Sequence, residues 1–205
     1  YPYDQILSGV TELPNQMTLG ATWNADLARQ VGVILGDELS ALGFNLLLGP
    51  SLDVLETPHT VSANDLGTRT FGGDPFWVGK LGQAYIEGVH AGGDGQVAVI
   101  AKHFPGYGGS DRLPEDEVAT VRKSLDQLLS FELTPFINVT GQAPSAEATA
   151  DGLLTAHIRY QGFQGNIRST TRPVSFDSEA LSLLLNLPDL SQWRQDGGVM
   201  VSDNL

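Results

Sequence analysis

Three short apolar runs along the chain each stop abruptly at polar or charged residues. The runs and the residues after them are 44–48 (FNLLL) before Asp53, 97–101 (VAVIA) before Lys102 and His103, and 198–201 (GVMV) before Ser202 and Asp203. An uninterrupted apolar run is typical of a strand buried on both faces of a parallel sheet. Because α/β folds hold their chemistry at the carboxyl ends of such strands, the polar residues after each run are the first candidates for a site.

Apolar residues at helical spacing precede each strand, and a fourth strand is predicted at residues 152–155 (GLLT), which end at His157. The predicted helices are 25–42 capped by Asn24, 75–92 capped by Asp74, 121–137 broken near Pro135, and 178–187 capped by Asp177. The order is therefore helix–strand, repeated four times. This alternation predicts parallel strands joined by crossover helices.

The segments between these elements are uneven in length. Long polar loops follow the strands at residues 54–73, 106–117 and 159–175, residues 140–150 are a linker or flexible loop, and the turns after helices are short. Long functional loops after strands are typical of a (β/α)8 barrel. The pattern favours an α/β fold of the TIM-barrel type over an open doubly wound sheet, although four strands alone fit both.

Composition narrows the class of protein. A chain of 205 residues is long enough for one domain, and its net charge of −13 speaks against nucleic acid or an anionic membrane surface as a partner. There is no cysteine, so neither a disulfide nor a thiolate metal site is possible. No run approaches the ~18 apolar residues of a membrane span, and no signal peptide is recognised. Since the chain opens at Tyr1 without Met, we expect it to be a piece of a longer protein.

Several strand-end residues could carry chemistry, and each has a structural alternative. Asp203 could be a nucleophile, a base or a metal ligand, or only a helix N-cap. Lys102 and His103 could grip the hydroxyls of a polyol, or could snorkel and pack. Asp53 could accept two sugar hydroxyls, or cap a turn. His157 ends a strand, where a lone histidine is more often structural than catalytic.

Arg69 lies in the glycine-containing loop 67–72, where its guanidinium could bind hydroxyls or pair with Asp53, or could simply be solvated. The glycines of residues 106–109 do not form a dinucleotide fingerprint, because the spacing is wrong and no helix opens directly after them. Phosphate loops, zinc spacings and nucleophile elbows are also missing from the sequence. We expect no cofactor and no metal ion.

Five segments, in order, resemble the motifs of glycoside hydrolase family 3. They are 48–54 (LGPSLDV, similar to Ala-Pro-Val-Leu-Asp-Val), 67–72 (GTRTFG, similar to Gly-x-Arg-Ser-Phe-Gly), 101–106 (AKHFPG, containing Lys-His-Phe-Pro-Gly), 155–158 (TAHI, similar to Ala-His-Val/Ile) and 199–205 (VMVSDNL, similar to Val-Val-Ser-Asp-Asp-Leu). Residues 14–20 resemble the family more loosely. Together the segments span most of the chain, so the resemblance is specific.

The resemblance implies part of a catalytic (β/α)8 barrel over residues 1–205, with early strands and the last strand outside the chain. It implies a retaining β-glycosidase, acting as β-N-acetylhexosaminidase or β-glucosidase, with Asp203 as nucleophile. It also implies a carbohydrate substrate gripped by Asp53, Arg69, Lys102 and His103, and we add His157 to these substrate-binding candidates. The compartment stays open, since members occur in the bacterial cytoplasm and exported.

Two departures from the family pattern leave alternatives. The loop 107–117 lacks the His of the family's Asp-x-His acid/base dyad, so only Asp111, Glu115, Asp116 and Glu117 remain there as weak candidates. The family's Asp-Gln-Glu-Gly-Gly segment is echoed only by Asp4 and Gln5. In the β-glucosidase branch a following domain supplies the acid, so a further C-terminal region of this protein is an expected partner. The rival hypotheses are a non-catalytic carbohydrate-binding relative and an unrelated open-sheet α/β enzyme.

A barrel that lacks strands has open edges and an exposed core. We therefore expect these residues alone to be poorly stable and nearly inactive.

Overall fold

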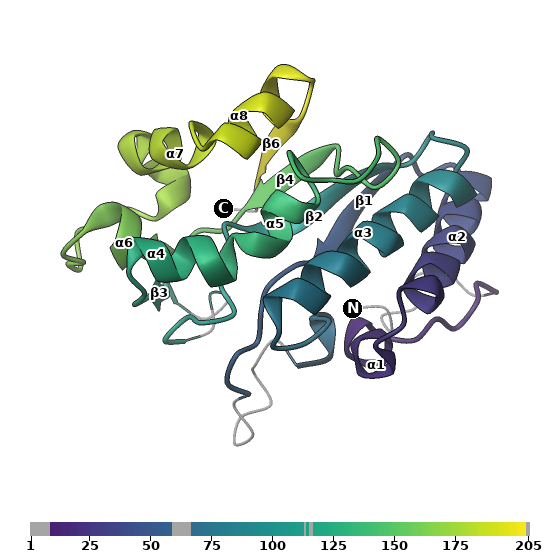
Figure 1. The fold of residues 1–205 in the computed structure, drawn as a ribbon, viewed down its shortest axis with the longest axis horizontal. Helices are drawn as coiled ribbons and strands as arrows, with labels where there is room; N and C mark the ends of the chain where they lie inside the picture. Colours follow the sequence, from purple (N-terminus) through teal and green to yellow (C-terminus); the bar gives the residue numbers. More distant parts are fainter. Residues whose placement is uncertain (1–8, 59–66, 113, 115–116, 204–205) are drawn as a thin grey trace.

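The computed structural model describes residues 9–58, 67–112, 114 and 117–203. Its centre is a sheet of four parallel strands in the order β1-β2-β4-β6 (Figure 1). The strands are β1 (Leu46–Ser51), β2 (Ala98–Phe104), β4 (Gly152–Thr155) and β6 (Val199–Ser202). Parallel pairing in chain order confirms the repeated helix–strand pattern predicted from the sequence. A second, two-stranded sheet pairs β3 (Thr120–Val121) with β5 (Arg159–Tyr160).

Helices and helical turns connect the strands. The α-helices are α1 (Gln16–Thr22), α2 (Ala25–Ala41), α3 (Pro75–Gly92), α4 (Leu125–Gln127), α5 (Thr134–Asn138), α6 (Gln161–Gln164), α7 (Ser178–Leu185) and α8 (Pro188–Gln195). Two 3-10 turns, η1 (Gly67–Arg69) and η3 (Val174–Phe176), and the π-helical η2 (Leu128–Glu132) complete the set. In Figure 1, α2 and α3 lie together at the β1 end of the sheet, and α7 and α8 lie beside β6.

The predicted N-caps are confirmed by hydrogen bonds. Asn24 accepts from the backbone N–H of Asp26 at 2.9 Å, Asp74 from Phe76 at 2.9 Å and Asp177 from Ala180 at 3.1 Å. Each cap satisfies backbone donors that the first helical turn cannot pair internally. The starts of α2, α3 and α7 were therefore readable from the sequence.

The predicted strand limits need correction. β1 begins two residues later than predicted and continues through Gly49 and Pro50, and β2 continues past its apolar run. Lys102 and His103 therefore lie within β2 and not beyond it. The reason is pairing on both sides, since Lys102 is in register with Ser51 and Leu154, and Phe104 with Thr155. A central strand keeps its ladder wherever its neighbours supply partners, whatever the polarity of its side chains.

The helix predicted over 121–137 is wrong at its start and is divided. Val121 pairs in β3, and the helical segment begins after Ser124, whose side chain forms a capping box with Gln127. The division occurs at the turn containing Pro135, which has no N–H to continue a helical ladder. The loop predicted over 159–175 also contains β5, α6 and η3, while α1 and α8 were not predicted.

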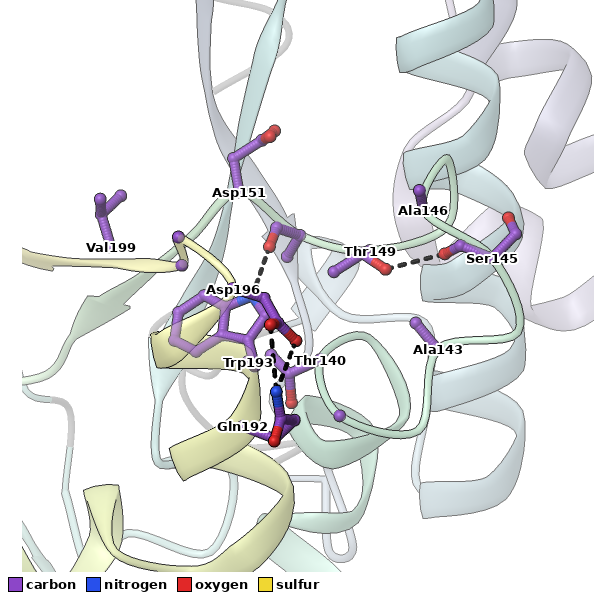
Figure 2. A pocket seen from close by; sticks show the side chains of 14 residues that line it. Thr140, Ala143, Ser145, Ala146, Thr149, Asp151, Gln192, Trp193, Asp196 and Val199 are labelled. Carbon is purple, nitrogen blue, oxygen red and sulfur yellow. Dashed lines mark hydrogen bonds between the residues drawn. The ribbon is translucent and has the colours of Figure 1, made fainter.

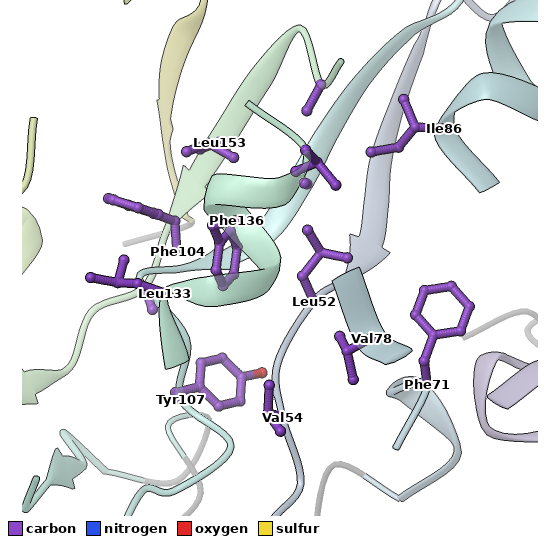
Figure 3. Close-up of a cluster of buried hydrophobic side chains, with 14 of the residues drawn as sticks. Leu52, Val54, Phe71, Val78, Ile86, Phe104, Tyr107, Leu133, Phe136 and Leu153 are labelled. Carbon is purple, nitrogen blue, oxygen red and sulfur yellow. The ribbon is translucent and has the colours of Figure 1, made fainter. Parts of the chain in front are cut away.

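The hydrophobic core lies between the sheet and the helices α3 and α5 (Figure 3). Phe104 at the end of β2 packs edge-on against Phe136 of α5, with ring centroids 5.5 Å apart. Leu52 and Val54, the two neighbours of Asp53, are fully buried in the same cluster. The backbone on both sides of Asp53 is consequently fixed by core packing.

Both outer strands of the main sheet present apolar side chains to solvent. Phe44, Leu46 and Leu48, at and before β1, and Val199 of β6 are each 46–48% exposed. Among the described strands, none pairs with the outer side of β1 or β6. Open edges with exposed apolar residues are what a closed barrel would cover with further strands, and this fits an incomplete barrel. No helix in the described part of the chain is long and apolar enough to cross a membrane.

Candidate active site

The backbone ladder continues beyond the carboxyl ends of the strands and gathers the predicted site residues at one edge of the sheet. The N–H of Ala156 donates to the carbonyl of Phe104 at 2.8 Å, and the N–H of Asp203 donates to that of Thr155 at 3.4 Å. At the other side of β2, the N–H of Leu52 donates to the carbonyl of Lys102. Residues that follow β1 and β4 therefore emerge next to the end of β2, and those that follow β6 emerge next to the end of β4.

Asp53 is the buried charge of this edge. Its carboxylate is fully buried and accepts hydrogen bonds from the Ser51 hydroxyl at 2.7 Å, from His103 Nδ1 at 2.7 Å and from the Tyr107 N–H at 2.9 Å. Burial alone would raise the pKa of Asp53, but the ion pair with His103 and these hydrogen bonds outweigh it and hold the pKa below its usual value. The site therefore contains a fixed, ionised carboxylate.

Asp53 in turn orients His103. Because an ionised carboxylate can only accept, Nδ1 of His103 carries the proton in this contact. The Tyr107 hydroxyl lies 3.4 Å from Nε2, and the two rings lie 4.4 Å apart. The imidazole is thus held in one orientation, and His103 is only 9% exposed.

The Lys102 ammonium is influenced by three other charged side chains, Asp53, Asp203 and Arg69. Burial lowers its pKa, the negative charges of Asp53 and Asp203 raise it, and the positive charge of Arg69 lowers it, with a net decrease. All three groups are therefore close enough to Lys102 to change its charge equilibrium. Asp53 after β1, Asp203 after β6 and Arg69 of η1 thus all act electrostatically on Lys102 within β2. That these residues form one substrate site stays a prediction.

His157 contacts the protein through both ring nitrogens. Nδ1 lies 2.7 Å from the Ser175 hydroxyl, Nε2 lies 3.2 Å from the backbone oxygen of Asp203, and the ring stacks on Phe176 at 5.1 Å. The carbonyl can only accept, so Nε2 donates. These contacts favour a role for His157 in positioning the Asp203 backbone; direct substrate binding by His157 stays a prediction.

The acidic candidates in the loop after β2 are engaged elsewhere. Asp111 accepts from the Thr120 N–H at 2.8 Å and lies 3.3 Å from Arg112 Nε, while Glu117 lies 2.7 Å from Arg112 Nη1. These contacts hold the two acids within the loop and its neighbouring segment. Residues 115 and 116, the other two candidates, lie outside the described residues.

Three residues of the site escaped the sequence prediction. Ser51 and Tyr107 donate to the Asp53 carboxylate, and the Thr70 hydroxyl donates to the Asp53 backbone carbonyl. Ser51 could have been found, because it precedes Asp53 by two residues in an extended segment. Tyr107 and Thr70 sit in irregular loops, where no periodicity points to them.

A cavity of about 680 Å³ lies at the opposite end of the sheet (Figure 2). Its walls come from the segments that precede β4 and β6, including Asp151 and Val199 at the starts of those strands. Trp193 closes one side and donates through Nε1 to the carbonyl of Ala150 at 2.8 Å. This cavity is separate from the charged cluster. Within the described ranges, no group of three His, Asp or Glu side chains could hold a metal ion.

The chain matches a family model and several curated proteins. Residues 3–205 match the model of the glycosyl hydrolase family 3 N-terminal domain. A β-hexosaminidase of Hydrogenovibrio crunogenus is 32% identical over 158 residues, covering 74% of this chain but 41% of the relative, and a Pseudomonas aeruginosa β-hexosaminidase is equally identical over 157 residues, covering 76% and 43%. The chain therefore spans about two fifths of the length of these curated relatives.

The solved structure of a family 3 β-N-acetylglucosaminidase from Paenibacillus sp. FPU-7 superimposes with a TM-score of 0.72 at 26% identity, covering 97% of this chain and 40% of that one. Structural neighbours of this family are TIM-type barrels, which agrees with the parallel sheet and its open edges. The match to the family model covers nearly every residue. The chain belongs to glycosyl hydrolase family 3.

Proposed function

We propose that the protein containing this chain hydrolyses terminal β-linked sugars with retention of configuration. The observation that carries the proposal is the convergence of Asp53, Arg69, Lys102 and Asp203 at the carboxyl edge of the sheet. A cluster of two carboxylates and two cations beside a buried histidine matches the polar surface of a sugar ring. Membership of a glycosidase family makes hydrolysis the reaction that this cluster fits best.

In the proposed reaction the Asp203 carboxylate attacks the anomeric carbon. The bond between that carbon and the glycosidic oxygen breaks, the leaving alcohol takes a proton from a general acid, and a glycosyl ester forms on Asp203. Water then gives a proton to the conjugate base of that acid and attacks the same carbon, the bond to the Asp203 oxygen breaks, and the sugar leaves with its original β configuration. The general acid is not assigned to a described residue.

The ring hydroxyls would be held by the residues around Lys102. The Lys102 ammonium and the Arg69 guanidinium would donate to hydroxyl oxygens, and the buried Asp53 carboxylate would hold His103 beside them. His103 is already fixed by its 2.7 Å hydrogen bond to Asp53, so little reorganisation accompanies binding. Hydrogen bonds that strengthen as charge develops on the ring would lower the barrier.

The preferred sugar in this proposal is β-linked N-acetylglucosamine. Support comes from the curated relatives named β-hexosaminidase and from the structural neighbour named β-N-acetylglucosaminidase. Another structural neighbour is named a β-glucoside phosphorylase; it superimposes with a TM-score of 0.76 at 25% identity, over 94% of this chain and 33% of that one. A β-glucoside is therefore the second substrate to test.

The test offers aryl β-N-acetylglucosaminide and aryl β-glucoside to the whole protein and compares kcat/KM. We expect hydrolysis of the first to be faster by roughly tenfold or more, because a site that pairs with the acetamido group leaves polar groups unpaired when glucose binds. The configuration of the first-formed sugar is followed by NMR and should be β. Initial formation of the α sugar would contradict the retaining mechanism.

A non-catalytic, carbohydrate-binding relative is the second candidate. The observation in its favour is the engagement of Asp111 and Glu117 by Arg112, which leaves neither as an obvious acid. Calorimetry of the sugar product separates the two functions. Binding of N-acetylglucosamine with no release of aryl alcohol between pH 4 and pH 9 would favour the second.

A further inference from the structure

A buried carboxyl group lies behind the site without a part in the proposed reaction. Glu132 of η2 is 0% exposed, and Lys123 Nζ lies 2.8 Å from its Oε1. This contact is an ion pair without the angles of a well-aligned hydrogen bond, and neither carboxyl oxygen has a hydrogen-bond partner among the described residues. A buried charge with so few partners is costly, which calls for a reason beyond packing.

Lys123 also reaches the segment that carries Asp53. Its Nζ lies 2.8 Å from Oε2 of Glu56, three residues after Asp53, and 4.1 Å from the centre of the Phe131 ring. The Lys123 side chain is only 15% exposed, whereas Glu56 is 52% exposed. One ammonium group therefore joins the segment after β1 to η2, with a ring below it that favours a cation.

The turn of residues 106–109 is packed between this ammonium and the Asp53 segment. A Cβ atom on Gly109 would lie 2.7 Å from Glu132 Oε1 and 3.1 Å from Lys123 Cε. On the other side, a Cβ atom on Gly108 would lie 1.9 Å from the Val54 carbonyl oxygen. The turn therefore packs against the rigid Val54 backbone on one side and against the side chains of Lys123 and Glu132 on the other.

The same turn supplies a hydrogen bond to the site. Tyr107 directly precedes Gly108, and its N–H donates to Asp53 Oδ1 at 2.9 Å. We propose that Lys123 is a positioning residue, which through Glu56 and Glu132 holds the 106–109 turn against Asp53 and so keeps Asp53 and His103 in place for the sugar. This role rests on the proposed glycosidase function, but its effect on the turn does not.

The charge on Glu132 makes its ion pair with Lys123 dependent on pH. Burial raises the pKa of Glu132 to about 7; Lys123 opposes this shift and the charges of Asp53 and Glu56 add to it. Lys123, Asp53 and Glu56 are thus the charged groups around it, and the buried hydroxyl of Tyr160 also senses its charge. Protonation of Glu132 below about pH 7 removes one of the two charged partners of Lys123 and loosens the turn.

The experiment compares three variants in the whole protein. Lys123→Met removes the ammonium and keeps most of the stem, Lys123→Arg restores a cation, and Arg29→Met breaks the exposed 2.8 Å pair with Glu87 as a matched control. Hydrogen exchange of peptides covering 105–112 reports the turn directly, and kcat and KM for the better aryl glycoside report the site. Glu132→Gln, measured from pH 6 to pH 8.5, tests the pH dependence.

We expect Lys123→Met to speed exchange in 105–112 selectively and to lower kcat/KM by roughly tenfold to a hundredfold. Lys123→Arg should recover most of both, Arg29→Met should match wild type, and Glu132→Gln should abolish a fall of kcat/KM below about pH 7. Faster exchange throughout the protein, or unchanged exchange at 105–112, would overturn the proposal.

Two further outcomes keep the tests separate. If Lys123→Met does not fold, Glu56→Gln removes only the charge of the half-exposed partner. Unchanged hydrogen exchange at 105–112 in that variant counts against the proposed role of Lys123. If the wild-type protein hydrolyses neither glycoside, the proposed function fails while hydrogen exchange still decides the role of Lys123.

Discussion

Asp203→Asn is expected to reduce the hydrolysis of aryl β-glycosides by about 10⁴-fold or more, because an amide cannot form the glycosyl ester. Most of the loss should fall on kcat, since Lys102, Arg69 and the Asp53–His103 pair still bind the ring hydroxyls. Steady-state kinetics with an activated aryl leaving group measures the loss. The size of the effect follows from removing the atom that forms the bond, and not from a change in binding.

Asp203→Gly supplies a positive version of the same prediction. Azide in the space of the missing carboxylate attacks the anomeric carbon, a carbon–nitrogen bond forms, and the aryl group leaves as the phenolate to give an α-glycosyl azide. Asp196→Asn, a change of the same charge in the segment before β6, is the control and should retain wild-type kcat. Full activity of Asp203→Asn would exclude the nucleophile assignment.

Much of this site was predictable because strand ends carry strong local signals. The apolar runs before Lys102, His157 and Asp203 locate three strands, and parallel pairing aligns their carboxyl ends along one edge. The apolar runs do not predict the residue at which backbone pairing between strands ends. Lys102 and His103 lie inside β2, because Lys102 pairs with both neighbouring strands and Phe104 pairs with β4.

The parts that were not predictable depend on contacts distant in sequence. Glu132 reads as one polar residue on a helix, and its burial follows from the packing of the 106–109 turn above it. Lys123 reads as a solvated residue before a capping box, yet it joins Glu56 to Glu132, residues 76 positions apart in sequence. Neither role leaves a periodic pattern, so only the fold reveals it.

For Asp53 the sequence predicts the position of the residue but not its contacts. Its place after β1 and its resemblance to a family motif made it a candidate. Its hydrogen bonds from Ser51, His103 and Tyr107 could not be read from the sequence, because two of the donors belong to the segment at the end of β2. These donors decide what the residue does, since they keep a fully buried carboxyl ionised.

Asp53→Asn is expected to lower the free energy of unfolding by about 3–5 kcal/mol, because breaking a buried ion pair leaves His103 and the surrounding donors unpaired. The amide cannot accept from every donor, since its own NH₂ group must face one of them. Activity should fall as well, by roughly a hundredfold, because His103 loses its fixed orientation. Urea unfolding and steady-state kinetics measure the two losses, and Asp37→Asn on the exposed face of α2 should change neither.

The pH dependence of that stability loss follows from the lowered pKa of Asp53. In the unfolded chain an aspartate titrates near about 3.9, and in the folded chain Asp53 titrates below this value. Its stabilising contribution is therefore complete above about pH 4 and disappears as the pH falls through the folded pKa. The difference between wild type and Asp53→Asn should be full at pH 6 and smaller near pH 3. An equal difference at both pH values would mean that donors around a neutral side chain, and not the ionised carboxylate, hold this part of the site together.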